Sequence, residues 1–130
     1  MLGEGFILTE AEREILSQTV PKSISLINRY MNGKDIVQRS RNLFIIDLHG
    51  LQESDLVRHP SIYQRIRDRV RPIRLEMKDK QRREKWWLFG RSNQEIRSAM
   101  GALDRYIATC RTAKHRLFFF SLAMYYRMRR

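Results

Sequence analysis

Four cations recur at helical spacing in the middle of the chain, and their charge suits a polyanion. The steps between them are four, three and four residues: Arg67, Arg71, Arg74 and Lys78. On a helix such residues lie along one face, where they could follow a phosphate backbone. They could equally form the solvated side of a helix whose other side is packed. Spacing alone leaves both interpretations open.

The chain as a whole is strongly basic. It has 26 Lys and Arg against 14 Asp and Glu, a formal net charge of +12 and a pI near 10.7. A surface with this charge attracts nucleic acid before other partners. The composition therefore favours nucleic-acid contact over an inert basic surface.

Trp86 and Trp87 directly follow a second group of cations, Lys80, Arg82, Arg83 and Lys85. We expect a strand over 86–89, entered from a basic connector and closed by Gly90. Alternation along a strand would direct the two rings to opposite faces of the sheet. Core packing is favoured for at least one of them, and the alternatives are a partner interface or base stacking beside Lys85 and Arg91.

The residue types that catalysis needs are not arranged for it. The single cysteine, Cys110, and three scattered histidines form neither an internal disulfide nor a zinc site. The only G-x-G, at residues 3–5, follows no strand, so no dinucleotide or adenosylmethionine loop is visible. Glu76-Met77-Lys78 has the E-x-K form of metal-dependent nucleases, with Asp47 upstream. Its helical periodicity predicts a surface pair instead.

The apolar runs are short. The longest, 43–48 and 117–120, are far below the roughly 20 residues of a membrane span, and Met1 is not followed by the apolar core of a signal peptide. One cysteine and six methionines also suit a reducing compartment. We expect a cytoplasmic protein with no membrane partner.

The elements that position these residues are helices and strands in mixed order. T-x-x-E at Thr9 and S-x-x-E at Ser92 indicate helix starts, and Pro72 is expected to kink or split a long apolar stripe. The sequence therefore predicts an α+β fold in a small mixed domain. Its expected helices are about 9–18, 54–58, 60–80 and 93–103, and its expected strands about 43–48, 86–89, 106–108 and 116–120.

Three segments carry additional expectations. The run 43–48 is typical of a strand buried on both faces. The apolar segment 24–30 fits either a strand or a short helix, and Asn32-Gly33 indicates a turn after it. Polar residues 109–115 would join the last two strands, with Cys110 as an ordinary strand-end residue.

Several short motifs occur along the chain, and their order and spacing together are specific for a protein family. They are Gly5–Thr9, Tyr30–Ile36 with N-G-K-D, Ile45–Asp47, Tyr63, Val70–Pro72, Trp86-Trp87, Gly90-Arg91, Arg105–Ala108 and Lys114–Arg116. Together they resemble class I adenine-specific DNA methyltransferases of the fused restriction–modification kind (type IIG/IIL). The similar segment, from Gly5 to about Phe119, is the one between the catalytic domain and the target-recognition domain.

The resemblance implies an enzyme that transfers a methyl group from S-adenosylmethionine to the N6 amine of an extruded adenine. In that family the Asn-Pro-Pro-aromatic motif and the adenosylmethionine loop lie upstream of this segment, and neither occurs in these 130 residues. We therefore expect no catalytic, cofactor-binding or metal-binding residue here, and a catalytic domain that acts in cis or in trans.

The same resemblance assigns the basic residues to the backbone of double-stranded DNA. The predicted DNA-binding residues are Arg67, Arg71, Arg74, Lys78, Arg82, Arg83, Lys85, Arg91, Lys114 and Arg116. Residues 1–120 would form the connector and the start of the target-recognition region. Residues 121–130 depart from the family as a basic tail, which a frameshifted or truncated gene remnant would explain.

Two alternatives to the connector stay open at this point. One is a stand-alone basic nucleic-acid-binding module in which Trp86 or Trp87 stacks on unpaired bases. The other is a non-functional remnant whose charge only keeps it soluble, with Phe118–Phe120 exposed.

Overall fold

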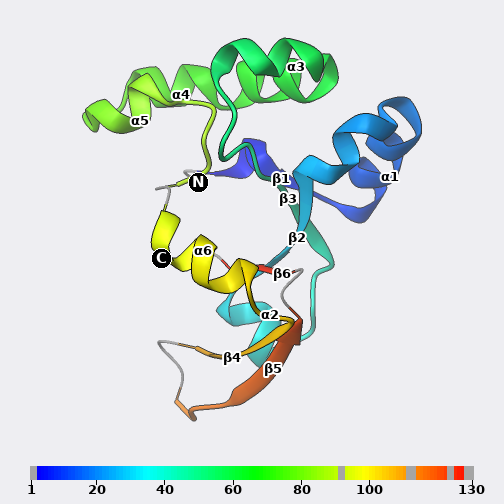
Figure 1. Cartoon of the computed structure of the whole chain (residues 1–130), viewed down its shortest axis with the longest axis vertical. Helices are drawn as coiled ribbons and strands as arrows, with labels where there is room; N and C mark the ends of the chain where they lie inside the picture. The colour runs from blue at the N-terminus through cyan, green and yellow to red at the C-terminus, as the bar shows by residue number, and fades with distance from the viewer. Residues whose placement is uncertain (1–2, 91–92, 111–113, 123–124, 128–130) are drawn as a thin grey trace.

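The computed structural model describes residues 3–90, 93–110, 114–122 and 125–127, and it has the predicted α+β fold. Figure 1 shows a layer of three helices above a four-stranded sheet, with a further helix and a two-stranded sheet at the other end of the molecule. The three helices of the layer are α3 (Pro60–Arg69), α4 (Arg71–Leu75) and α5 (Lys80–Glu84).

The four-stranded sheet is built around β3 (Leu43–Ile46). The strand order is β1-β3-β2-β6, with β1 (Ile7–Leu8), β2 (Ile27–Met31) and β6 (Tyr125–Arg127). β3 is antiparallel to both β1 and β2, whereas β2 and β6 are parallel. Ile45 and Ile46 are adjacent, face opposite sides of the sheet and are both 0% exposed. This confirms a strand buried on both faces.

The first helix forms where the capping signature predicts it. α1 (Glu10–Thr19) starts at Thr9, whose hydroxyl accepts from the Glu12 amide at 3.2 Å. The Glu12 carboxylate accepts in return from the Thr9 amide at 2.9 Å, which completes a capping box. A 3-10 helix η1 (Glu4–Phe6) precedes β1. A second one, η2 (Pro21–Leu26), leads into β2, so the ambiguous segment 24–30 is partly helix and partly strand.

The prediction of a turn at Asn32-Gly33 is wrong, because these residues begin a helix. In α2 (Gly33–Val37), Asn32 is the N-cap in an extended conformation and its side chain accepts from the Lys34 amide at 2.9 Å. Asn is as good at an N-cap as in a turn, since its short side chain reaches free backbone amides in both settings.

Pro72 splits the predicted helix over 60–80. α3 ends at Arg69, α4 restarts at Arg71 with Pro72 in its first turn, and α5 is separate. Ile62, Ile66 and Val70 are buried, as the apolar stripe predicts, but Ile73 on α4 is 52% exposed. The apolar stripe is therefore buried on α3 and up to Val70, whereas Ile73 on α4 is not. The helix expected over 54–58 is the 3-10 helix η3 (Glu53–Arg58).

The strand predicted over 86–89 is absent. These residues form turns that follow α5, with the Leu88 amide donating to the Lys85 carbonyl at 3.0 Å. Trp86 and Trp87 are nevertheless both buried, at 4% and 7% exposure, and Phe89 is buried beside Phe6. Aromatic content predicted a strand, but none of the described strands pairs with this segment, and the rings fill the core from a turn instead.

The last described elements are a helix and a hairpin. α6 (Gln94–Gly101) confirms the predicted helix, although Ser92 lies outside the described residues and Asn93 makes no side-chain capping bond. β4 (Arg105–Thr109) and β5 (Phe118–Leu122) confirm the two predicted strands, and the structure pairs them antiparallel.

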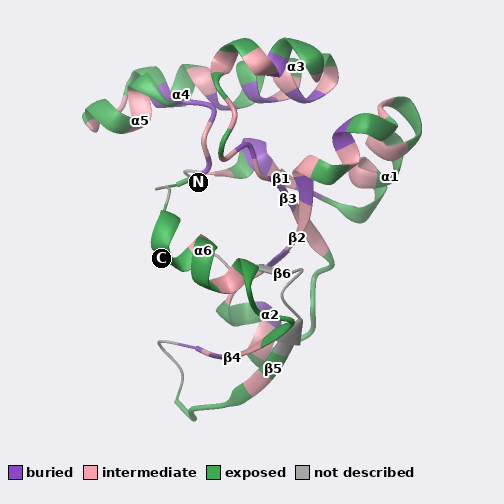
Figure 2. Ribbon diagram, viewed as in Figure 1, coloured by how far each residue is buried: buried purple, intermediate pink, exposed green. Residues whose placement is uncertain are grey.

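Burial is concentrated in one part of the chain. The residues of the hydrophobic core cluster lie between Phe6 and Phe89. They come from the four-stranded sheet, α3 and the turn over residues 86–89, which we call the tryptophan turn. Figure 2 shows mostly exposed surface on α6 and around the β4–β5 hairpin. Within the described residues, no helix is long and apolar enough to span a membrane.

Candidate nucleic-acid interface

The predicted row of four cations does not share one environment. Arg67 on α3 and Lys78 beyond α4 are exposed. Arg71 is partly buried, and its guanidinium carbon lies 5.6 Å from the centre of the Trp86 ring. Arg74 is only 2% exposed, so it cannot reach a phosphate in this structure, contrary to the prediction. Arg74 lies four residues after the buried Val70, and its amide donates to the Val70 carbonyl oxygen at 3.0 Å, so its side chain continues the buried face of α3.

Arg74 is part of the packing. Its guanidinium carbon lies 5.7 Å from the centre of the Phe6 ring, and its Nη2 donates to the Leu88 carbonyl oxygen at 3.5 Å. Burial lowers the pKa of Arg74 and the neighbouring Arg82 lowers it further, while Asp79 opposes the change. Arg74 therefore joins η1, α4 and the tryptophan turn.

The next three predicted DNA-binding residues, Arg82, Arg83 and Lys85, also differ in their exposure. Arg82 Nε lies 3.5 Å from a carboxylate oxygen of Asp79, and Arg83 Nη1 donates to the Met77 carbonyl oxygen at 2.6 Å. Both side chains hold α5 against the turn that precedes it. Lys85, one residue past α5, is exposed.

The tryptophans serve the core and are not available to bases. Trp87 Nε1 donates to the Leu51 carbonyl oxygen at 3.0 Å, which satisfies its one donor. Trp86 lies 6.2 Å from Tyr63 and 6.1 Å from Trp87, measured between ring centres. Core packing is confirmed for both rings, and their burial contradicts base stacking by either of them.

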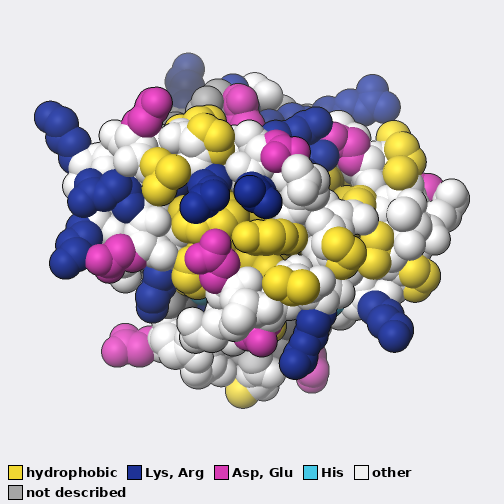
Figure 3. All heavy atoms as spheres, turned by 90° about the horizontal axis from the view of Figure 1, so that it is seen from above, with side chains coloured by type: hydrophobic (Ala, Val, Ile, Leu, Met, Phe, Trp, Pro, Cys, Tyr) yellow, Lys and Arg dark blue, Asp and Glu magenta, His cyan; other side chains and the backbone are white. Residues whose placement is uncertain are grey.

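The surface of the helical layer mixes charge with apolar groups. Figure 3 looks onto this layer and shows Lys and Arg side chains around a hydrophobic patch. Ile73 and Leu75 of α4 are both more than half exposed. Of the predicted DNA-binding residues, Arg91 lies outside the described residues, and the exposed ones are Arg67, Lys78, Lys85, Lys114 and Arg116.

Arg65 has a role that the sequence analysis missed. Its side chain donates to the Gly5 carbonyl oxygen at 3.2 Å, to the Ile7 carbonyl oxygen at 3.0 Å and to a Glu12 carboxylate oxygen at 2.9 Å. Burial raises the pKa of Glu12, but the bonds from Thr9 and Arg65 outweigh it and the pKa is lowered. Arg65 thus fixes the N-terminal segment to α3. No local pattern could reveal a contact across so many residues.

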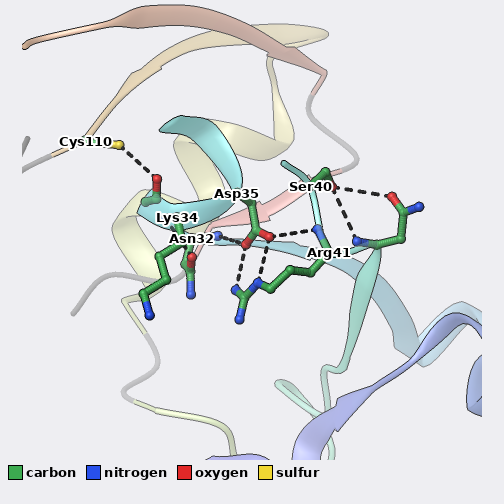
Figure 4. A network of polar contacts seen from close by, with 8 residues as sticks. Asn32, Lys34, Asp35, Ser40, Arg41 and Cys110 are labelled. Atoms are coloured by element: carbon green, nitrogen blue, oxygen red, sulfur yellow. Dashed lines mark hydrogen bonds and ion pairs between the residues drawn. The ribbon is translucent and has the colours of Figure 1, made fainter. Parts of the chain in front are cut away.

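The N-G-K-D motif forms a polar network around Asp35, shown in Figure 4. One Asp35 oxygen accepts from Arg41 Nε at 2.9 Å and from the Arg41 amide at 3.1 Å. The other accepts from Arg41 Nη2 at 2.8 Å and from the Asn32 amide at 2.9 Å. The bonds from Arg41 outweigh burial and, with those from the backbone, lower the pKa of Asp35 to about 2. The motif therefore builds α2 and the loop after it.

The two acids of the nuclease-like pattern lie in different environments. Asp47 pairs with Arg97 of α6 at 2.8 Å, and Glu76 is exposed at the end of α4. Across the described ranges, no three His, Cys, Asp or Glu side chains gather as metal ligands would. Cys110, just after β4, is buried, and its thiol lies 3.4 Å from the Gly33 carbonyl oxygen.

The fold is similar to part of a solved restriction–modification enzyme. It matches the type IIL restriction–modification enzyme MmeI, solved in complex with DNA, over 95% of this chain with a TM-score of 0.64 and 16% sequence identity. The chain spans only 16% of the length of that enzyme's chain. No family model and no curated protein matches the sequence. The likeness agrees, at the level of the fold, with the restriction–modification resemblance of the sequence.

Proposed function

We propose that this chain is a DNA-binding segment of a restriction–modification methyltransferase, the connector between its catalytic and target-recognition domains. It holds the phosphate backbone of duplex DNA and does not transfer methyl groups by itself. The catalytic domain lies outside these residues and supplies methyl transfer in cis or in trans.

One observation carries the proposal. The fold of nearly the whole chain is similar to one portion of an enzyme solved on DNA, and the motifs of the sequence resemble that class of enzyme independently of the structure. A net charge of +12 adds the electrostatic attraction that backbone contact requires.

The structure narrows the set of residues that can make the contact. Arg74, Arg82 and Arg83 stabilise the helical layer from within. Arg67, Lys78 and Lys85 are exposed on the same layer and are the cations that we assign to DNA there. Since phosphate contacts position a protein without reading sequence, this assignment implies affinity for duplex DNA of any sequence.

A charge-reversal pair of variants tests the assignment. The variant Arg67→Glu, Lys78→Glu, Lys85→Glu should weaken duplex binding and reduce the slope of log K against log salt by about 3, roughly 0.9 for each lost phosphate contact. The control Lys22→Glu, Lys34→Glu, Arg39→Glu changes net charge equally at exposed positions elsewhere. It should keep most of the slope. Equal losses in both variants would show that only total charge matters and would refute the assigned surface.

The connector role also has a consequence for the cofactor, S-adenosylmethionine. Because the motifs for adenosylmethionine and for catalysis lie outside these residues, we expect no adenosylmethionine binding by calorimetry and no methylation by the chain alone. Methylation of DNA by the purified chain would contradict the connector role.

A further inference from the structure

The β4–β5 hairpin has two unlike faces. Residues opposite each other in an antiparallel pair share a face, and the register pairs Ile107 with Phe120 and Ala108 with Phe119. Ala108 is 2% exposed, and Cys110 beside it contacts Gly33 of α2. This inner face is packed on the rest of the protein.

The outer face is apolar and open. Ile107 is 59% exposed, Phe118 67% and Phe120 72%, and all three lie on this side of the hairpin. Among the described residues the Phe118 ring has no aromatic or cation–π contact. Two exposed phenyl rings two residues apart on one strand form a flat apolar surface that folding of the described residues leaves uncovered.

Cations border this face, and the nearest acid in the sequence is the exposed Asp104 before β4. The Arg105 guanidinium carbon lies 5.7 Å from the centre of the Phe120 ring, and Lys114 and Arg116 are exposed just before β5. From Arg105 to Arg130 the sequence contains seven Lys and Arg and no Asp or Glu. Rings flanked by an excess of cations match the two parts of a nucleotide, a flat base and an anionic phosphate.

We propose that the outer face of the β4–β5 hairpin binds unpaired bases of a DNA strand. Phe118 and Phe120 stack on the bases, and Arg105, Lys114 and Arg116 contact the phosphates beside them. Stacking on aromatic side chains accepts any base, so this face has little sequence preference. The inference goes beyond the proposed duplex contact, because it concerns a different surface and a different state of the DNA.

The test compares two double variants of the full chain that keep the face apolar. Phe118→Leu with Phe120→Leu removes the rings, and Phe118→Trp with Phe120→Trp keeps them. Binding is measured by fluorescence anisotropy to a single strand of about 16 nucleotides and to the matching duplex. Thermal melting of each variant checks that its fold is retained.

We expect the leucine variant to bind the single strand at least about tenfold more weakly and the duplex as the unaltered chain does. The tryptophan variant should keep single-strand affinity, and its added fluorescence should be quenched by the stacked bases. Unchanged single-strand affinity in a folded leucine variant would overturn the inference, as would loss of affinity in a folded tryptophan variant.

The outcome is separable from that of the proposed function. A chain that binds no duplex but binds single strands in a ring-dependent way refutes the connector and supports this face. A chain that binds duplex, with single-strand binding indifferent to the rings, refutes this face and leaves the connector standing.

Discussion

Phe6 and Phe118 are the same residue type in two regions of the chain. Phe6 is 0% exposed within residues 3–90, where it lies 5.3 Å from Phe89 and beneath the guanidinium of Arg74. Phe118 is 67% exposed within residues 93–120. All residues of the core cluster belong to the first region. The first region therefore supplies most of the stability, and the second leaves its aromatic residues at the surface.

Some arginines show the same contrast, although Arg97 of the second region pairs with Asp47 of the first. In the first region Arg65, Arg74 and Arg83 donate to backbone carbonyl oxygens that fix one segment to another. In the second, Arg105 lies over an exposed ring and Arg116 is exposed. The net charge of the chain thus overstates the number of cations available for binding, because some arginine side chains make contacts within the fold.

Matched phenylalanine substitutions should show the largest contrast between the regions. Phe6→Ala should lower the free energy of unfolding by about 3–5 kcal/mol, because it leaves a cavity among Phe89, Arg74 and the sheet. Phe118→Ala should change it by about 0.5 kcal/mol or less. Urea unfolding of both variants measures the difference, and similar losses would show that the hairpin face is buried in solution.

Matched arginine substitutions should give an intermediate contrast. Arg65→Ala should cost about 2 kcal/mol, since it leaves the Gly5 and Ile7 carbonyl oxygens and the Glu12 carboxylate without their donor. Arg116→Ala should leave the melting temperature unchanged and weaken DNA binding. A destabilised Arg116→Ala variant with full affinity would reverse the assignment of roles.

Asp35 should show how pH acts on the first region. Its pKa is about 2 in the folded chain and close to 3.8 without the Arg41 network, so the carboxylate stabilises the fold above about pH 4. That stabilisation, about 2 kcal/mol, is lost as the pH falls from 4 toward 2. Asp35→Asn should therefore be less stable than the unaltered chain at pH 7, with the gap closing below pH 4. A constant gap in unfolding experiments across this range would contradict the network.

Local signals predicted the elements that local chemistry determines. Thr9 and Glu12 satisfy each other within one turn, and Pro72 prevents α3 from continuing without a break into α4. The runs of β-branched and aromatic residues that form β4 and β5 are likewise local. These features were predictable because their cause lies within a few residues of the pattern.

Features that depend on distant residues were not predictable. The aromatic run at Trp86 was interpreted as a strand, yet its rings fill space between Tyr63 and Leu51 and need no strand partner. The spacing of Arg74 suggested a phosphate contact, but its side chain is buried against Phe6 and the Leu88 carbonyl oxygen. Of the candidate interface, the sequence predicted the charge and not which cations remain exposed.

Binding of the chain to a DNA duplex, measured across salt concentrations, tests the central claim most directly. If three to five exposed cations contact phosphates, the slope of log K against log salt should lie at about −3 to −4.5. A slope near zero, or no binding at low ionic strength, would contradict the claim that this chain holds the DNA backbone.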